Sequence, residues 1–388
     1  MKLNKQVSIN TSRFETIDGI RGIAALGVVI YHLSGNLSPD LNQLFPDFLN
    51  LIFSYGYLGV PIFFVVSGFV ISLSIRESRI TLKYAGTFVL RRSFRLDLTY
   101  WASIAFALVL LNIKNQVLDS AEPMPSFSNI LAHMFYLQDL LAIKPVISVV
   151  YWTLCLEVQL YLFYIFTVWA SQKVRPLFFC SEYLIHICLI TIVGLVSLFL
   201  EFGLIEIKIP GLFVSNWHYF LLGILVSNVV RGLNYSKQIL LAWLLIELFF
   251  QLEVQLKAYA VTGISSTLFI YFMWKKDLLN TFLTNGVFQY LGKISYTLYL
   301  VHPDIGWKFI SFSKLVLQDY MTPLLAGIIF VFGIAISILV AHAFHLLFEK
   351  PSLWVVSKLK TDSVKTVYYN IKSKFISSIR DFTLLRGK

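Results

Sequence analysis

The sequence predicts an all-α membrane protein: a polytopic bundle of about ten transmembrane helices with both termini in the cytoplasm. Three observations lead to this fold class. The 388 residues are 57% hydrophobic and only 14% charged, which leaves too little polar surface for a water-soluble protein of this size. The chain contains ten apolar runs close to the ~20 residues that cross a bilayer as a helix. Lysine and arginine gather on one side of these runs.

The ten predicted spans define the domain organisation. They cover about 16–35, 51–74, 96–113, 150–171, 183–201, 212–230, 238–254, 258–274, 288–304 and 322–347. Polar residues interrupt the third, seventh and ninth runs, so the ends of these three are the least sharply defined. We expect a cytoplasmic N-terminus over 1–15, a ten-helix membrane domain over 16–350 and a basic, amphipathic cytoplasmic tail over 351–388. The first run carries Arg21, and we expect it to be retained as a helix rather than cleaved as a signal peptide.

Positive charge orients the bundle. With the N-terminus inside, 24 of the 32 Lys and Arg residues fall on the cytoplasmic side and six on the outer side. This bias obeys the positive-inside rule and favours an even number of spans. The net charge of +11 therefore reflects membrane topology, and we expect no nucleic-acid partner.

Two segments outside the spans have an expected role. The longest outer connection, 114–149, contains the apolar stretch LAHMFYLQDLL, which we expect to pack over the bundle as a re-entrant or interfacial piece. At the other end, Pro351 is expected to stop the tenth helix, and the basic tail that follows to lie on anionic membrane lipids.

Arg21 and His32 are polar residues in the first predicted helix. They are eleven residues apart, which is three helical turns plus ~20° and a rise of ~16.5 Å. Both therefore lie on one helix face, at opposite ends. The alternative is that Arg21 extends to the inner headgroups and His32 is an ordinary polar helix end.

Glu157 lies inside the fourth run, in YWTLCLEVQLYLF. An ionised side chain at membrane depth costs ~3 kcal/mol on insertion scales, so it usually faces a cavity or a partner. Because its helix enters from the same side as His32, we expect the carboxylate to orient that imidazole. The alternative is a buried polar pair that only specifies helix packing.

Three arginines precede the third run in LRRSFRLDL. Arg92 and Arg95 are three residues apart, on one helix face. Two guanidinium groups so placed suit a phosphate or pyrophosphate. The alternative is that these arginines only fix the topology.

The ninth and tenth runs also carry polar residues. Ser295, Tyr299 and His302 form one stripe with i, i+4, i+7 spacing, as expected for a stripe that lines a cavity or forms hydrogen bonds across helices. His342 and His345 are spaced i, i+3, but no third and fourth ligands accompany them, so we expect no metal site.

These segments, in this order, resemble the acyltransferase family 3 of integral membrane proteins. IDGIRGIAALGVVIYHLSG is similar to the family's opening motif, an Arg followed by ten residues and a His, and LRRSFRL to its RxxR element. YWTLCLEVQLYLF is similar to its W-S-L-x-x-E-x-Q-F-Y stretch: it keeps Trp152, Glu157, Gln159 and Tyr161 and has Thr153 and Leu160 for the common Ser and Phe. GYLGVPIFFVVSGFVIS, LGKISYTLYLVHPDI and FEKPS complete the resemblance, which covers roughly 13–352.

The resemblance implies a membrane O-acyltransferase of the bacterial cytoplasmic (inner) membrane. Members typically O-acetylate bacterial surface glycans, nodulation factors or other extracytoplasmic acceptors. It implies acetyl-CoA as the cytoplasmic acyl donor, with no metal. The implied acceptor is a glycan or lipid-linked glycan of the O-antigen, capsule or exopolysaccharide type. The chain resembles the standalone form without a periplasmic SGNH domain, so a separate periplasmic acyl-accepting protein is a possible partner.

The resemblance also implies roles for single residues. The expected catalytic residues are His32, Glu157 and Arg21, with His32 as a general base or as a transiently acylated nucleophile. The residues expected to hold acetyl-CoA are Arg92, Arg95, Tyr296 and Tyr299. Those expected to stack on the acceptor sugar are Trp152 and Tyr161.

Two other classes of function fit part of the sequence. A transporter or flippase of lipid-linked sugars explains the ten helices and the basic cytoplasmic loops equally well. It does not explain the arginine pair together with an intramembrane His and Glu, and the sequence shows no evident inverted repeat or broken helix. A scaffold inside a glycan-synthesis complex is the third interpretation, for which loss of His32 would be silent.

Overall fold

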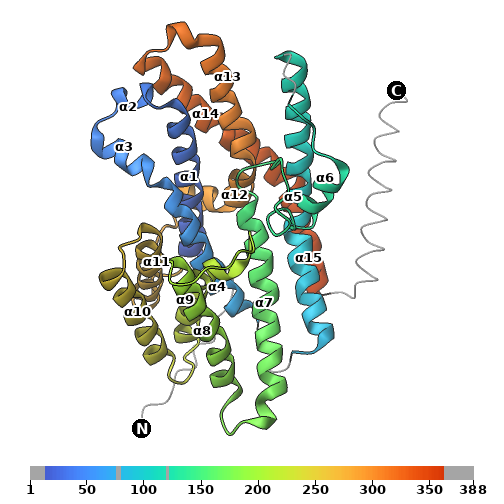
Figure 1. The fold of residues 1–388 in the computed structure, drawn as a ribbon, viewed down its shortest axis with the longest axis vertical. Coiled ribbons are helices and arrows are strands. Elements are labelled where there is room, and N and C mark those ends of the chain that lie inside the picture. The colour runs from blue at the N-terminus through green and yellow to red at the C-terminus, as the bar shows by residue number, and fades with distance from the viewer. Residues whose placement is uncertain (1–13, 76–79, 119–121, 362–388) are drawn as a thin grey trace.

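The computed structural model describes residues 14–75, 80–118 and 122–361. These residues form helices and connecting segments and contain no strand (Figure 1). The predicted all-α fold is therefore confirmed. The long helices are α1 (Glu15–Leu37), α4 (Gly59–Ser74), α5 (Leu82–Val117), α7 (Trp152–Val174), α8 (Glu182–Glu201), α9 (Trp217–Val230), α10 (Ser236–Glu253), α11 (Ala258–Lys275), α12 (Gly286–His302) and α14 (Pro323–Phe344).

Shorter elements connect and extend these helices. They are α2 (Asp40–Leu44), α3 (Asp47–Ser54), η1 (Gly56–Leu58), α6 (Phe127–Met134), η2 (Arg175–Leu177), η3 (Phe213–Asn216), η4 (Pro303–Trp307), α13 (Lys308–Leu317), η5 (Gln318–Tyr320), η6 (His345–Glu349) and α15 (Lys350–Thr361). The segments η4 and η6 are single π-helical turns. Such turns are rare and occur frequently at functional sites.

Local sequence explains where many helices begin. A Ser, Thr or Asn side chain accepts a hydrogen bond from a backbone N–H of the first turn and so satisfies one of the unpaired donors there. The capping residues are Thr81 for α5, Ser126 for α6, Ser181 for α8, Asn285 for α12 and Thr322 for α14.

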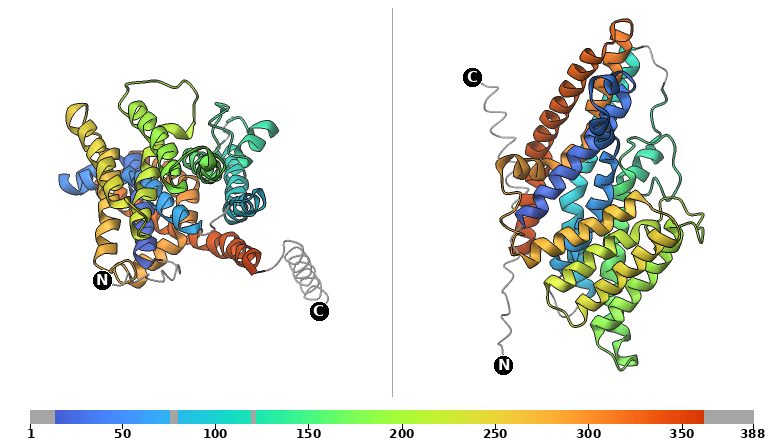
Figure 2. Two further views of the ribbon diagram at one scale, coloured as in Figure 1. Left: turned by 90° about the horizontal axis from the view of Figure 1, so that it is seen from below. Right: turned by 90° about the vertical axis from the view of Figure 1, so that its left-hand side faces the viewer.

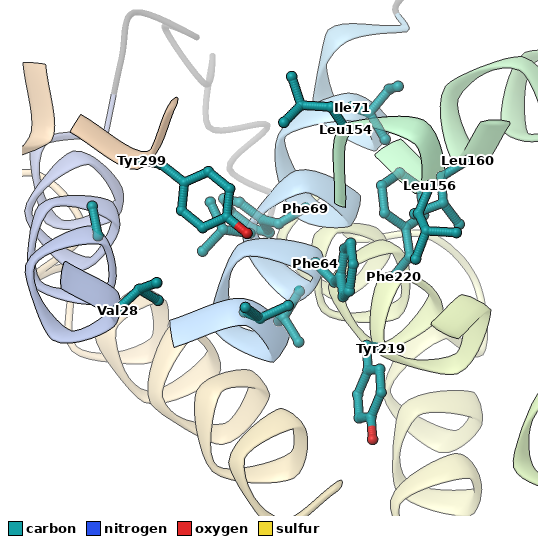
Figure 3. Close-up of a cluster of buried hydrophobic side chains, with 14 of the residues drawn as sticks. Val28, Phe64, Phe69, Ile71, Leu154, Leu156, Leu160, Tyr219, Phe220 and Tyr299 are labelled. Atoms are coloured by element: carbon teal, nitrogen blue, oxygen red, sulfur yellow. The ribbon is translucent and has the colours of Figure 1, made fainter. Parts of the chain in front are cut away.

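The bundle is organised around α1, α4 and α9. Every residue of α9 is buried, because the helix is enclosed by α4, α8, α10 and α11. On its other side α4 contacts α1, which packs against α12 and α14. Figure 2 shows α10 and α11 on one side of this centre and α5 and α6 on the other. The core joins Val28 of α1, Phe64 of α4, Leu154 of α7 and Phe220 of α9 (Figure 3).

Glycines allow the central helices to approach closely. A Cβ added to Gly22 of α1 would lie 2.5 Å from the backbone nitrogen of Gly292 in α12, and one on Gly223 of α9 would lie 1.9 Å from the carbonyl oxygen of Val65 in α4. Backbone contact of this kind, through small residues, is typical of helix pairs in membranes.

Seven helical segments in the described residues are long and apolar enough to cross a membrane. They correspond to seven of the ten predicted spans. The other three, α10, α11 and α12, are helices at the predicted positions that do not meet this standard: α12 has only 17 residues, and α10 carries Lys237, Glu247 and Glu253. The third span proved longer than predicted, because α5 begins at Leu82.

The connection between α5 and α7 packs against the bundle, as predicted, while its placement on the outer side of the membrane stays a prediction. Its helix α6 contacts α5, and the indole nitrogen of Trp101 donates to the carbonyl oxygen of Met134 at 3.0 Å. The Cys155 thiol of α7 in turn donates to the carbonyl of Tyr136 at 3.1 Å.

The prediction that Pro351 stops the last helix is wrong. The chain passes from α14 through the π turn η6 into α15, and Pro351 is the second residue of α15. A proline is tolerated in a first helical turn, where its missing N–H is not needed. Residues 1–13 and 362–388 lie outside the described residues, so the cytoplasmic placement of both ends and the amphipathic tail stay predictions.

Candidate functional site

His32 of α1 and His302 of α12 form a hydrogen-bonded pair. The Nδ1 atom of His32 lies 2.8 Å from Nε2 of His302, and the two rings stack with their centroids 5.1 Å apart. His302 is fully buried, whereas His32 is partly accessible. Because α1 and α12 run in parallel from the Gly22–Gly292 contact, the two histidines reach the same level of the bundle.

The partners of His302 determine which nitrogen of His32 is free. The Nδ1 atom of His302 lies 3.1 Å from the carbonyl oxygen of Leu298 and 2.9 Å from that of Tyr299. A carbonyl only accepts, so this nitrogen carries the proton, and in the neutral ring Nε2 is an acceptor. We therefore assign the Nδ1 proton of His32 to the bond with His302. This leaves the Nε2 lone pair of His32 for a substrate.

Aromatic rings enclose His32 on two further sides. Trp307 lies 5.5 Å and Tyr31 5.2 Å from its ring centroid. The π turn η4, which directly follows His302, carries Trp307 back toward α1. The histidine pair is thus a packed site with one nitrogen exposed, not a polar helix end.

A small, partly open cavity of about 60 Å³ lies between α1, α4, α7 and α12. Its polar wall consists of Arg21, Ser67, Thr153, Glu157, Ser295, Tyr296 and Tyr299. The predicted polar stripe of α12 thus divides: Ser295 and Tyr299 line this cavity, and His302 contacts His32.

Glu157 belongs to the cavity and not to His32. One of its carboxylate oxygens accepts a hydrogen bond from Ser67 at 2.9 Å and another from Tyr161. The hydrogen bond described for the His32 ring goes to His302. The expected pairing of Glu157 with His32 is therefore wrong.

Arg21, Arg92 and Arg95 lie close to one another and to Glu157. The guanidinium of Arg92 lies 4.9 Å from the Tyr161 ring centroid and donates to the Ser74 hydroxyl at 3.4 Å. Arg21, Arg95 and Glu157 are all close enough to act on Arg92 electrostatically. The sequence elements carrying Arg21 and Arg92, more than 70 residues apart, therefore meet in one cationic cluster next to Glu157.

Tyr161 lies elsewhere than expected, whereas the acceptor role of Trp152 stays a prediction. Tyr161 is buried under Arg92 and bonded to Glu157, so it belongs to the arginine side and not to the side of His32. Trp152 is the first residue of α7 and is partly buried, next to Thr153.

Arg92 and Tyr161 also border a second cavity of about 320 Å³ between α5 and α7. Its wall is mostly apolar, with Ser93, Asp97 and the Tyr136 ring as neighbours of Arg92. The Tyr136 hydroxyl donates to Asp97 at 2.9 Å.

Tyr299 separates the small cavity from the histidine pair. Its hydroxyl is 3.0 Å from the Thr153 hydroxyl, and its ring lies 6.0 Å from that of His302 and 5.6 Å from that of Phe63. Figure 3 shows Tyr299 projecting from α12 toward α4. Tyr296 lines the cavity and donates to the carbonyl oxygen of Leu96 at 3.0 Å, which joins α12 to α5.

His302 is the site residue that the sequence argument did not assign. Its place on the α12 stripe was visible, but the contact with His32 depends on how two helices face each other. The histidines of the last helix have separate partners, Tyr290 for His342 and Glu349 for His345. No group of three His, Cys, Asp or Glu residues in the described part of the chain is arranged to hold a metal ion.

The comparisons with known proteins agree with the resemblance inferred from the motifs. No curated protein and no solved structure matches the chain. A family model described as an acyltransferase domain matches residues 14–342, which include α1 to α13, nearly all of α14 and the site residues from Arg21 to His302. This multi-pass chain therefore belongs to the acyltransferase family 3 of integral membrane proteins.

Proposed function

We propose that this acyltransferase moves an acetyl group from cytoplasmic acetyl-CoA to a hydroxyl of an extracytoplasmic or lipid-linked glycan. We place it in the bacterial cytoplasmic membrane. The observation that carries the proposal is the order of groups along α1. The arginine cluster lies at the small cavity, which Arg21 lines, and Tyr299 lies between this cavity and the histidine pair.

The arginine end suits the donor. Coenzyme A carries phosphate and pyrophosphate groups, and guanidinium forks bind these through paired, charge-assisted hydrogen bonds. Arg92 and Arg95 supply two such forks, and Arg21 adds a third positive charge nearby. Glu157 balances part of this charge and, with Tyr161, holds Arg92 in place.

The small cavity suits the reacting end of the donor. At about 60 Å³ it has room for an acetyl group and not for the whole coenzyme. The Tyr299 hydroxyl accepts from Thr153 and can donate its own proton to the thioester carbonyl, whereas Ser67 and Ser295 already donate to Glu157 and to the Gly292 carbonyl. A donor held by its phosphates at Arg92 would direct the thioester into this cavity.

The histidine end suits the acceptor. The His32 Nε2 lone pair would take the proton of the acceptor hydroxyl as its oxygen bonds to the acetyl carbonyl carbon. The carbon–sulfur bond breaks, and the coenzyme leaves as a thiol with the proton that His32 held. If His32 is instead the first acyl acceptor, the same lone pair attacks the carbonyl carbon, the carbon–sulfur bond breaks and the coenzyme leaves as a thiolate. The glycan hydroxyl oxygen then takes the acetyl group from nitrogen, and the proton that it releases neutralises the thiolate.

The test uses the purified protein with radiolabelled acetyl-CoA and a de-O-acylated oligosaccharide from the surface polysaccharide of the source cell. We expect CoA release that depends on the acceptor and a labelled glycan that is heavier by one acetyl group per repeat unit. His32→Ala should leave the membrane level of the protein normal and abolish transfer. Near-normal product from this variant would remove His32 from the mechanism. Oligosaccharide transport without CoA release would favour the transporter.

A further inference from the structure

A row of tyrosines leads across the bundle to His32. Tyr259 of α11 stacks on Tyr57 of η1 with ring centroids 5.5 Å apart. Tyr57 meets Tyr31 of α1 edge-on at 5.4 Å, and Tyr31 lies 5.2 Å from His32. Tyr55 extends the row beside Tyr57, at 6.2 Å.

Close backbone packing builds this row. Between Tyr55 and Tyr57, Gly56 lies so close to α1 that an added Cβ would be 2.1 Å from the carbonyl oxygen of Gly27 and 2.9 Å from Cβ of Tyr31. The missing side chain lets η1 lie directly on α1, which brings Tyr57 over Tyr31. The row is therefore part of the fold and not a chance meeting of surface side chains.

The tyrosines expose part of their apolar rings, and their hydroxyls are free to form hydrogen bonds with a ligand. Tyr31, Tyr57 and Tyr259 are each partly exposed, and Tyr55 is 46% exposed. Within the described part of the chain, the hydroxyls of Tyr31, Tyr57 and Tyr259 make no hydrogen bond. Tyrosines that only anchor a protein at the membrane surface point into the headgroup layer, whereas these rings contact one another and His32.

We propose that Tyr31, Tyr57 and Tyr259 form the platform that binds the sugar rings of the acceptor and leads its hydroxyl to His32. The inference rests on the proposed function and names a substrate subsite for it.

The chemistry of sugars matches this platform. A pyranose ring presents C–H groups on its faces, which the negative face of an aromatic ring attracts, while its hydroxyls point outward. Tyrosine adds a hydroxyl that can donate and accept at that edge. It also offers a rigid contact surface at a small cost in side-chain entropy. Because the row is several rings long, it can hold more than one sugar unit of a glycan chain.

The experiment measures binding and catalysis separately. Saturation-transfer NMR of the protein in nanodiscs uses the de-O-acylated oligosaccharide as probe. We expect Tyr57→Ala and Tyr259→Ala each to weaken oligosaccharide binding about three- to tenfold. The KM for the acceptor should rise by the same factor, with a much smaller change in the KM for acetyl-CoA. Tyr57→Phe keeps the ring and should lose less than Tyr57→Ala, which also guards against a folding defect.

Tyr320, 74% exposed in η5 and outside the row, is the matched control, and Tyr320→Ala should bind and react as the wild type does. The platform is wrong if the wild type does not bind the oligosaccharide, or if Tyr57→Ala and Tyr259→Ala bind it unchanged. Binding by the wild type without any CoA release would instead overturn the proposed function and leave a glycan-binding platform. If the wild type transfers acetyl groups but both alanine variants keep the wild-type KM for the acceptor, the platform is wrong and the proposed function stands.

Discussion

The Nδ1 atom of His32 lies 2.8 Å from the Nε2 atom of the buried His302. Two backbone carbonyls hold the other nitrogen of His302, so a chain of fixed donors and acceptors ends at the free Nε2 of His32. In hydrolase triads, too, a buried partner fixes the tautomer of the reactive imidazole.

Replacing His302 should therefore act through His32. For His302→Gln we expect kcat to fall about 10²-fold, since general-base catalysis by a well-placed group contributes ~10²- to 10⁴-fold. The KM for acetyl-CoA should stay the same, because the arginine cluster is untouched. His186→Gln, a change at another buried histidine in α8, is the control. A loss of kcat no greater in His302→Gln than in the control would contradict the positioning role.

The contact between α1 and α12 sets the level of both histidines. A methyl group at residue 22 would meet the Gly292 backbone at 2.5 Å, so Gly22→Ala should destabilise the protein by ~1–3 kcal/mol and lower its activity. Gly286→Ala, at a position of α12 with open space around it, should leave both unchanged. The melting temperature in detergent and the rate of acetyl transfer are measured for both variants. Equal melting temperatures for the two variants would show that the helices tolerate separation.

Arg92 should bind the donor through its planar guanidinium. Arg92→Lys keeps the charge but loses the fork and the contact with the Tyr161 ring, so we expect the KM for acetyl-CoA to rise about tenfold, a loss of ~1.4 kcal/mol. Arg175→Lys in η2, exposed at the far end of α7, is the control. An unchanged KM in Arg92→Lys would count against the phosphate-binding role.

The hydrogen bond between Thr153 and Tyr299 closes one end of the small cavity. Thr153→Ser keeps the hydroxyl and should behave as the wild type. Thr153→Val leaves the buried Tyr299 hydroxyl unpaired, which costs ~1–3 kcal/mol and should lower the melting temperature. Differential scanning fluorimetry compares the two. If serine and valine give the same melting temperature, the bond does not stabilise the bundle.

The helices could be predicted because their apolar runs are long. Ten runs gave ten helices at nearly the right positions. The exception is α5, whose inner half contains Arg91, Arg92 and Arg95. Hydropathy counts these residues against a span, yet the helix continues through them, and Arg92 lines the cavity between α5 and α7.

The site was only partly predictable for a geometric reason. Periodicity places residues on one face of their own helix, and it correctly grouped Ser295, Tyr299 and His302. It does not say which face of another helix they meet, so His302 was not matched to His32. Periodicity also could not show which helix face Glu157 meets, so the sequence predicted His32 as its partner. Glu157 contacts Ser67 and Tyr161 instead.

The central proposal is that donor and acceptor approach from opposite sides of one membrane, the donor at the arginine cluster and the acceptor at His32. Proteoliposomes with a single protein orientation, radiolabelled acetyl-CoA on the side of the arginine cluster and de-O-acylated oligosaccharide on the side of His32 measure this directly. The account predicts labelled oligosaccharide on the side of His32 and none for His32→Ala. Label that forms only when both substrates share one compartment would contradict it.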